Sequence, residues 1–215
     1  MAERRAFDEG PRPRLKATER GPALRKIAEA IRRRADELIA REVGHIGMPI
    51  AQMKQLAARA AENFDYDAGV VTELHGRTFQ AGDEFLNYTI RKPVGVAGLI
   101  MRRNTPVMLP TWRIAPALAA GNTIVLKPAE WSPRSSTLLA EVLAHAGVPD
   151  GVFKFVDGFD ASAAADLSGH VRPTPSVRTA GCRPRPCRVG ASSRSRDLDW
   201  TCHHVRERSY RFACG

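Results

Sequence analysis

The sequence predicts an α/β protein with a parallel sheet preceded by helices. Short apolar runs without alternation occupy 94–100, 123–126 and 152–156, which is typical of strands buried on both faces. Helical patterns over 106–120 and 135–146 separate them, and the links are short and rich in glycine and proline. Strand–helix–strand order with tight links implies parallel strands joined by right-handed crossovers, as in part of a Rossmann-like sheet.

Helices are expected before this sheet. The apolar residues of 24–38 recur at three- and four-residue steps, and 50–66 repeats the pattern after Pro49. Residues 1–22 are polar and interrupted by glycine and proline, so we expect an irregular segment. The three consecutive arginines at 32–34 are interpreted as a solvated helix face rather than a nucleic-acid site, because acidic residues lie within one turn of them.

The charge is unevenly distributed along the 215 residues. The net charge is +10, and residues 160–215 contribute ten arginines, no lysine and only five acids. We therefore expect three parts: an irregular segment at 1–22, an ordered domain at 23–159 and a basic tail at 160–215. Neither a secretory leader nor a run of apolar residues long enough for a membrane span is apparent, so a cytoplasmic protein without a membrane partner is expected.

The tail has the composition of a disordered segment, or of a segment read out of frame. It is rich in Arg, Pro, Ser and Gly and has no apolar periodicity. It also holds every cysteine of the chain, which together with two histidines prompts a zinc hypothesis; the spacing is irregular, and no metal is expected. Its arginines and aromatic residues leave a nucleic-acid-binding function as an alternative, although no recognition motif accompanies them. The cysteines and histidines are Cys182, Cys187, Cys202, His203, His204 and Cys214.

Candidate functional residues follow the first two predicted strands, because ligands of an open α/β sheet bind beyond the carboxyl ends of its strands. Asn104 carries a side-chain amide that could stabilise an oxyanion, although on spacing alone a turn asparagine before Thr-Pro is favoured. Lys127 and Glu130 could meet ribose hydroxyls or a phosphate, although a solvated pair is favoured on spacing alone. The usual G-x-G-x-x-G fingerprint is absent from both strand ends.

A longer pattern is more specific. The residues PVGVAGLI, NTP, TWRIAPALAAGNTIVLKPAEWSP and HAGVPDGVFKFVDGF resemble the aldehyde dehydrogenase superfamily, whose members oxidise aldehydes to acids with NAD(P). The resemblance covers about residues 6–159. Within the family, NTPVMLPTW and KPAEWSP resemble the hydroxymuconic semialdehyde dehydrogenases of aromatic-acid breakdown. The resemblance implies a partial Rossmann-like cofactor domain, a small aldehyde as substrate and a homo-oligomer in the intact family.

The resemblance also assigns roles to residues. It implies that Asn104 is the oxyanion-hole amide, and that Lys127 and Glu130 hold the adenosine ribose, with Glu130 favouring NAD over NADP by repelling a 2′-phosphate. It further implies that Ile100, Met101 and Ala129 line the cofactor cleft.

The chain departs from the family pattern in three places. Met101-Arg-Arg-Asn104 stands where the family has Thr-Pro-Trp-Asn, and no Phe-Thr-Gly-Ser segment follows Gly158. The nucleophilic cysteine and the general-base glutamate of the family are also missing, since none of the tail cysteines lies in a Gly-Gln-x-Cys setting. We therefore expect a fragment without turnover, and the hypothesis for its tail is a change of reading frame near 157–164.

Overall fold

The computed structural model separates into two compact units, which are described one at a time. The first unit spans Met1–Leu74 and Lys92–Arg183, and the second spans His75–Arg91 and Pro184–Gly215. The residues that the structure describes are 2–10, 15–80, 86–129, 133–158 and 179–180. The expected disorder of 160–215 falls almost wholly on residues outside these ranges.

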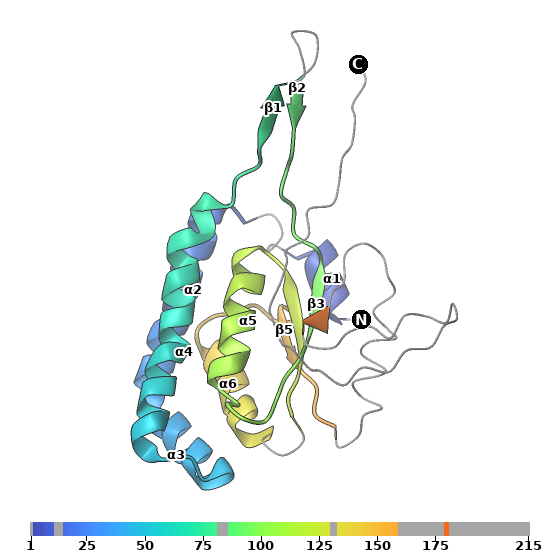
Figure 1. Ribbon diagram of the computed structural model, residues 1–215. Coiled ribbons are helices and arrows are strands. Elements are labelled where there is room, and N and C mark those ends of the chain that lie inside the picture. The colour runs from blue at the N-terminus through green and yellow to red at the C-terminus, as the bar shows by residue number, and fades with distance from the viewer. Residues whose placement is uncertain (1, 11–14, 81–85, 130–132, 159–178, 181–215) are drawn as a thin grey trace, which may run out of the picture. The chain divides into compact units, whose positions relative to one another are not determined.

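A four-stranded parallel sheet forms the centre of the first unit (Figure 1). Its order is β5-β4-β3-β6, and all three pairings are parallel, as the sequence predicts for the first three strands. The strands are β3 (Val96–Ile100), β4 (Thr123–Lys127), β5 (Phe153–Phe155) and β6 (Thr179–Ala180).

Helices cover the sheet and explain the apolar run within β4, one of its two central strands. Helices α5 (Met108–Ala119) and α6 (Pro133–His145) connect successive strands and pack on the sheet, and α1 (Ala2–Asp8) contacts β3 and β4 from the other side (Figure 1). Every residue of β4 is buried. A strand covered on both faces has no polar side to alternate with, which accounts for the uninterrupted apolar run TIVL.

The outer layer of helices begins earlier than expected and is divided differently. It consists of α2 (Ala17–Arg33), α3 (Ala35–Ile46), α4 (Ile50–Val70) and the single 3-10 turn η2 (Val71–Glu73). The single helix expected over 24–38 is thus broken at Arg34, whose φ of −106° and ψ of 18° are not helical. The break turns α3 so that Ile39 packs with Met53 and Ala57 of α4 in a small cluster of its own.

The segment 1–22, expected to be irregular, contains α1 and the first turns of α2. The Lys16 backbone N–H donates to the Glu19 carboxylate at 2.7 Å, which caps the start of α2. Pro22 lies inside this helix, where it removes one backbone hydrogen bond. The expectation from glycine and proline content was therefore wrong for 2–8 and 17–22, which are helical, whereas 9–10 and 15–16 are not helical and 11–14 lie outside the described residues.

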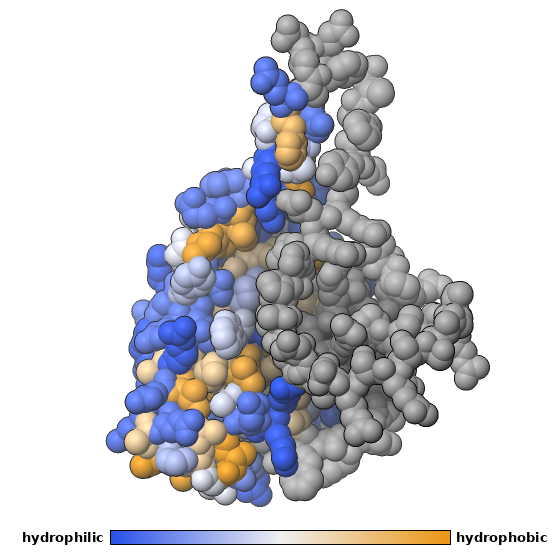
Figure 2. Space-filling view, in the orientation of Figure 1, coloured by the Kyte–Doolittle hydropathy of each residue, from blue (hydrophilic) through white to orange (hydrophobic). Residues whose placement is uncertain are grey.

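One contiguous core joins the sheet to the helices. Phe64 is fully buried in it, and Met53 is buried in the small cluster, so both are core residues as the helical spacing predicts. Hydrophilic side chains predominate on the outer helices, with apolar spots between them (Figure 2). The largest fully buried side chains of the first unit are Phe64, Leu24, Ile27, Ile31, Leu38, Met53, Ile114, Leu118, Ile124, Leu126 and Leu138.

The arginine run lies on a solvated face, as the sequence indicates. Arg32 pairs with Asp65 of α4, Arg33 approaches Glu29 at 4.0 Å, and Arg34 contacts both Glu37 and Glu141. The Arg32 and Arg33 side chains are at least half exposed. Pairs of this kind contribute little individually, so we interpret them as surface contacts between α2, α4 and α6.

A single turn joins α5 to β4 and also holds the start of β3. Gly121, at a φ of 86°, closes α5: its N–H reaches Leu118 O at 3.0 Å, and the next N–H reaches Ala117 O at 3.0 Å. The Asn122 side chain then accepts from the N–H groups of Val94 and Gly95 at 2.7 and 3.0 Å. Asn122 thereby fixes the beginnings of the two neighbouring strands relative to each other.

The described part of the second unit is a β-hairpin. Strands β1 (Thr78–Gln80) and β2 (Leu86–Tyr88) pair antiparallel, and Thr89 N donates to Arg77 O at 2.7 Å to extend the ladder. Its apolar side chains are open to solvent, with Leu86 76% and Tyr88 55% exposed. Among the described residues of either unit, no helix has the length and apolar character needed to cross a bilayer.

We predict that Asn122→Ala lowers the free energy of unfolding by about 1–3 kcal/mol, because the part-buried N–H of Val94 and the buried N–H of Gly95 lose their acceptor. Urea denaturation followed by circular dichroism measures the change. Asn87→Ala in the hairpin is the matched control and should alter stability by less than about 0.5 kcal/mol. Equal losses in the two variants would refute this role for Asn122.

Candidate functional site

The carboxyl ends of β3 and β4 lie side by side and bring three of the predicted residues together. Ile100 and Lys127 are paired across the two strands, and Met101 N donates to Lys127 O at 3.0 Å. Lys127 is only 4% exposed, and its Nζ donates to Pro128 O at 3.4 Å. Burial on this scale excludes the solvated strand-end lysine that spacing alone had favoured.

The remaining predicted residues lie in the loops after these strands. Asn104 is exposed, in the connection between β3 and α5, and Ala129 is half-buried two residues beyond β4. Arg102 and Arg103, which precede Asn104, are also exposed. Glu130 lies outside the described residues, so its predicted role on the ribose remains a prediction.

Among the described residues, two buried hydroxyl groups near this edge have no hydrogen-bond partner. Thr105 Oγ1 follows Asn104, and Ser135 Oγ lies in the first turn of α6. Polar atoms buried without a partner are rare and call for an explanation. A polar ligand at the strand ends would supply partners, so both hydroxyls are consistent with a binding site in this region.

The start of α5 is held from three neighbouring helices. The Glu42 carboxylate of α3 accepts from Val107 N at 2.7 Å. From α4, Asn63 Nδ2 donates to Thr111 Oγ1 at 3.0 Å, and from α6, Ser136 Oγ donates to Pro106 O at 3.5 Å. These contacts fix the end of the loop that carries Asn104.

Glu42 is the functional-site neighbour that the sequence analysis missed. It is 1% exposed, and burial raises the pKa of its carboxyl to about 7, against the opposing effect of the Val107 N–H. The sequence does contain a signal for it, because Leu38, Ile39 and Glu42 lie at helical spacing and share the buried face of α3. A glutamate at an apolar position of a helix stripe indicates a carboxylate with a specific buried partner.

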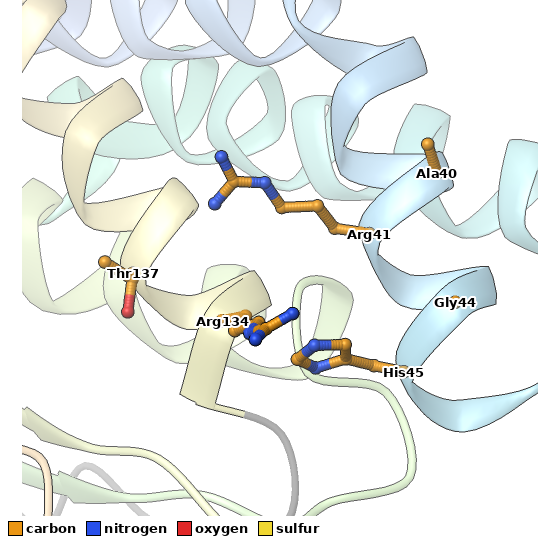
Figure 3. A pocket seen from close by; sticks show the side chains of 6 residues that line it. All are labelled: Ala40, Arg41, Gly44, His45, Arg134 and Thr137. Carbon is orange, nitrogen blue, oxygen red and sulfur yellow. The ribbon is translucent and has the colours of Figure 1, made fainter.

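A hollow of about 610 Å³ lies elsewhere, between α3 and α6. Arg41, His45 and Arg134 point into it, with Thr137 on the α6 wall (Figure 3). Arg41 is already paired with Glu37 at 3.0 Å. None of the predicted site residues lines this hollow, so it is separate from the strand-end site.

No cluster of three potential metal ligands occurs within the described ranges. The cysteines and histidines behind the zinc hypothesis all lie in 181–215, outside those ranges, so the expectation of no metal is untested.

Comparison with known proteins identifies the family. The sequence model of the aldehyde dehydrogenase family matches residues 2–181. The chain therefore belongs to the aldehyde dehydrogenase family, as its strand-end motifs indicate. The match continues past residue 159, where the resemblance seen in the sequence alone ended.

Individual relatives agree with this assignment. The chain is 40% identical to the 5-carboxymethyl-2-hydroxymuconate semialdehyde dehydrogenase of Escherichia coli, over 73% of this chain and 34% of the relative. HpcC from Thermus thermophilus is 47% identical with a TM-score of 0.75, over 79% of this chain and 33% of that one. An aldehyde dehydrogenase from Bacillus cereus in complex with NAD+ is 38% identical with a TM-score of 0.76, over 79% and 35%. The chain thus spans about a third of the length of these relatives.

We predict that stability falls as the pH rises from 4.5 towards 7, because the unfolded chain releases the Glu42 proton in this range while the buried carboxyl retains it. The pKa in the folded chain, about 7, lies above the ordinary 4.5, so the contribution of Glu42 is intact below pH 4.5 and is lost above 7. The full loss corresponds to about 3 kcal/mol. Urea denaturation from pH 4 to 8 should show this loss in the wild type and a shallower one in Glu42→Gln.

Asp67→Asn provides the comparison. Burial also raises the pKa of the half-buried Asp67, to about 6, so this variant should remove a part of the pH dependence that lies at lower pH. Identical pH profiles for the wild type and Glu42→Gln would contradict the assignment to Glu42.

Proposed function

We propose that this chain is an N-terminal part of an NAD-dependent aldehyde dehydrogenase that binds the cofactor at the ends of β3 and β4 and has no turnover by itself. The observation that carries the proposal is the pairing of Ile100 with the buried Lys127, three residues along the chain from Glu130 and beside the loop that holds Asn104. The proposed substrate of the intact enzyme is a small aldehyde, and the semialdehyde relatives favour a carboxylated one.

The residues present fit an adenosine ribose. A buried ammonium group at a strand end can donate to a ribose hydroxyl, and the unpartnered Thr105 and Ser135 hydroxyls offer further polar contacts nearby. Glu130 would accept from the ribose hydroxyls and would repel a 2′-phosphate, which favours NAD over NADP. Ile100, Met101 and Ala129 would line the cleft.

Asn104 has the exposure that a group contacting substrate requires. Its amide would donate to the oxygen of a reacting carbonyl, where negative charge develops as a nucleophile adds. The cofactor, when bound, supplies the acceptor for the hydride. The chain has no cysteine in a Gly-Gln-x-Cys setting to act as nucleophile and no glutamate that matches the general base of the family. It would therefore bind the cofactor without oxidising an aldehyde.

We predict NAD binding without aldehyde-dependent NADH formation. Isothermal titration calorimetry should detect weak binding, and Lys127→Met should weaken it about tenfold by removing a charge-assisted hydrogen bond. Lys26→Met on the exposed face of α2 is the control and should bind as the wild type does. NADH production above a blank would disprove the absence of turnover, and unchanged affinity in Lys127→Met would disprove the placement of the ribose.

The tail admits two interpretations. We propose that part of 160–215 results from a change of reading frame, since its Arg- and Pro-rich composition replaces the apolar pattern of the family. The alternative is a basic nucleic-acid-binding segment, which would bind phosphates through its ten arginines. The family match runs to residue 181, which counts against a change as early as 157–164 and is consistent with one later in the tail.

Translation of the coding DNA for residues 150–215 in the other two frames decides between these interpretations. We expect another frame to supply a Phe-Thr-Gly segment and, further on, Gly-Gln-x-Cys. If neither frame does, the tail is a genuine ending, and nucleic-acid binding becomes the function to test.

A further inference from the structure

We propose that Glu42 is a positioning residue that holds the loop carrying Asn104 in place, by presenting its carboxylate to the Val107 N–H at the start of α5. The proposal rests on the function proposed above, in which Asn104 contacts the reacting carbonyl. Glu42 would act through the loop and would touch neither substrate nor cofactor.

The geometry supports a direct mechanical link. Asn104 and Val107 are three residues apart, and the Val107 N–H donates to Glu42 Oε1 at 2.7 Å, a short hydrogen bond. Helix α5 begins directly afterwards, since Thr111 N donates to Val107 O at 3.3 Å. An exposed side chain at the end of a strand has a defined direction only if the far end of its loop is anchored, and Glu42 provides that anchor from a different helix.

A carboxylate suits this place for an electrostatic reason. The first N–H groups of a helix have no partner within the helix and carry partial positive charge, so an anion stabilises them. Glu42 is 65 residues from Val107 in sequence and almost fully buried, so the bond ties α3 to α5 across the interior. Burial outweighs this attraction, so the pKa of Glu42 is raised and the folded chain loses stability as the carboxyl ionises.

The surroundings of Glu42 allow its effect to be isolated. Among the described residues no charged side chain shifts its pKa, which is set by burial and by the Val107 N–H alone. On its own helix, Arg41 and His45 line the hollow that faces α6, where Arg134 joins them. In the loop itself, Arg102 and Arg103 are exposed.

The test is an NMR comparison of the whole chain with Glu42→Gln and Glu42→Leu. In the wild type the Val107 amide proton should shift with a midpoint near pH 7 as the carboxyl ionises. Glutamine keeps an acceptor, so it should preserve slow amide exchange at Val107 and abolish the titration. Leucine should speed that exchange at least about tenfold and lower the order parameters of 104–107 from about 0.85 to below about 0.6.

Thr111→Val is the matched control, because it removes another buried bond at the start of α5, the one from Asn63, and leaves the Glu42–Val107 bond in place. It should lower stability yet leave the Val107 titration and the order of 104–107 unchanged. An undisturbed loop in Glu42→Leu would overturn the proposal. If that variant does not fold, a Val107 titration that persists in Glu42→Gln would overturn it, because the midpoint would then belong to a group other than Glu42.

These measurements need no cofactor, so they are independent of the proposed function. A separate titration of NAD, followed at the amides of Ile100 and Met101, tests cofactor binding in the wild type. If the wild type does not bind NAD but Glu42→Leu still loosens the loop, the proposed function is refuted and the anchoring role stands. If the wild type binds NAD but the loop is unchanged in Glu42→Leu, the proposed function stands and the anchoring role is refuted.

Discussion

The parallel pairing of β3 with β4 is the constraint on which the other features depend. Parallel neighbours cannot be joined by a tight turn, so α5 must carry the chain from the end of one strand to the beginning of the next. The two carboxyl ends then meet at one edge, where Ile100 stands opposite Lys127. At the other edge, Asn122 bonds to Val94 and Gly95 and fixes the strand beginnings. The candidate site is therefore a consequence of strand direction more than of any single motif.

The sheet could be predicted from sequence because its signals are local. The apolar runs ending at Ile100 and Leu126 and the glycine at 121 each report on a few neighbouring residues, and the structure confirms the strands and the parallel pairing. The outer helices were predicted less well. The break at Arg34 depends on where Ile39 finds its partners on α4, and the start of α2 depends on a side-chain cap, so neither is encoded in periodicity alone.

The candidate site shows the same division. Sequence located Lys127 and Asn104 at strand ends, because the edge at which they lie follows from topology. It could not tell that Lys127 is buried, since burial is decided by elements packed from elsewhere in the chain. Glu42 escaped notice for a related reason: its partner is a backbone N–H in another element, which no side-chain pattern reveals.

The placement of α1 has a consequence for the order of events during synthesis. Thr123 Oγ1 donates to Glu3 O at 3.2 Å across 120 residues, and the buried Glu3 pairs with Lys154 at 3.1 Å. Helix α1 leaves the ribosome long before β4 and β5, and it finds its binding surface only when these two strands have emerged. Contacts of such long sequence separation close slowly. The face of α1 that contacts β4 and Lys154 is thus uncovered until those residues have emerged, a period in which a nascent chain depends on chaperones.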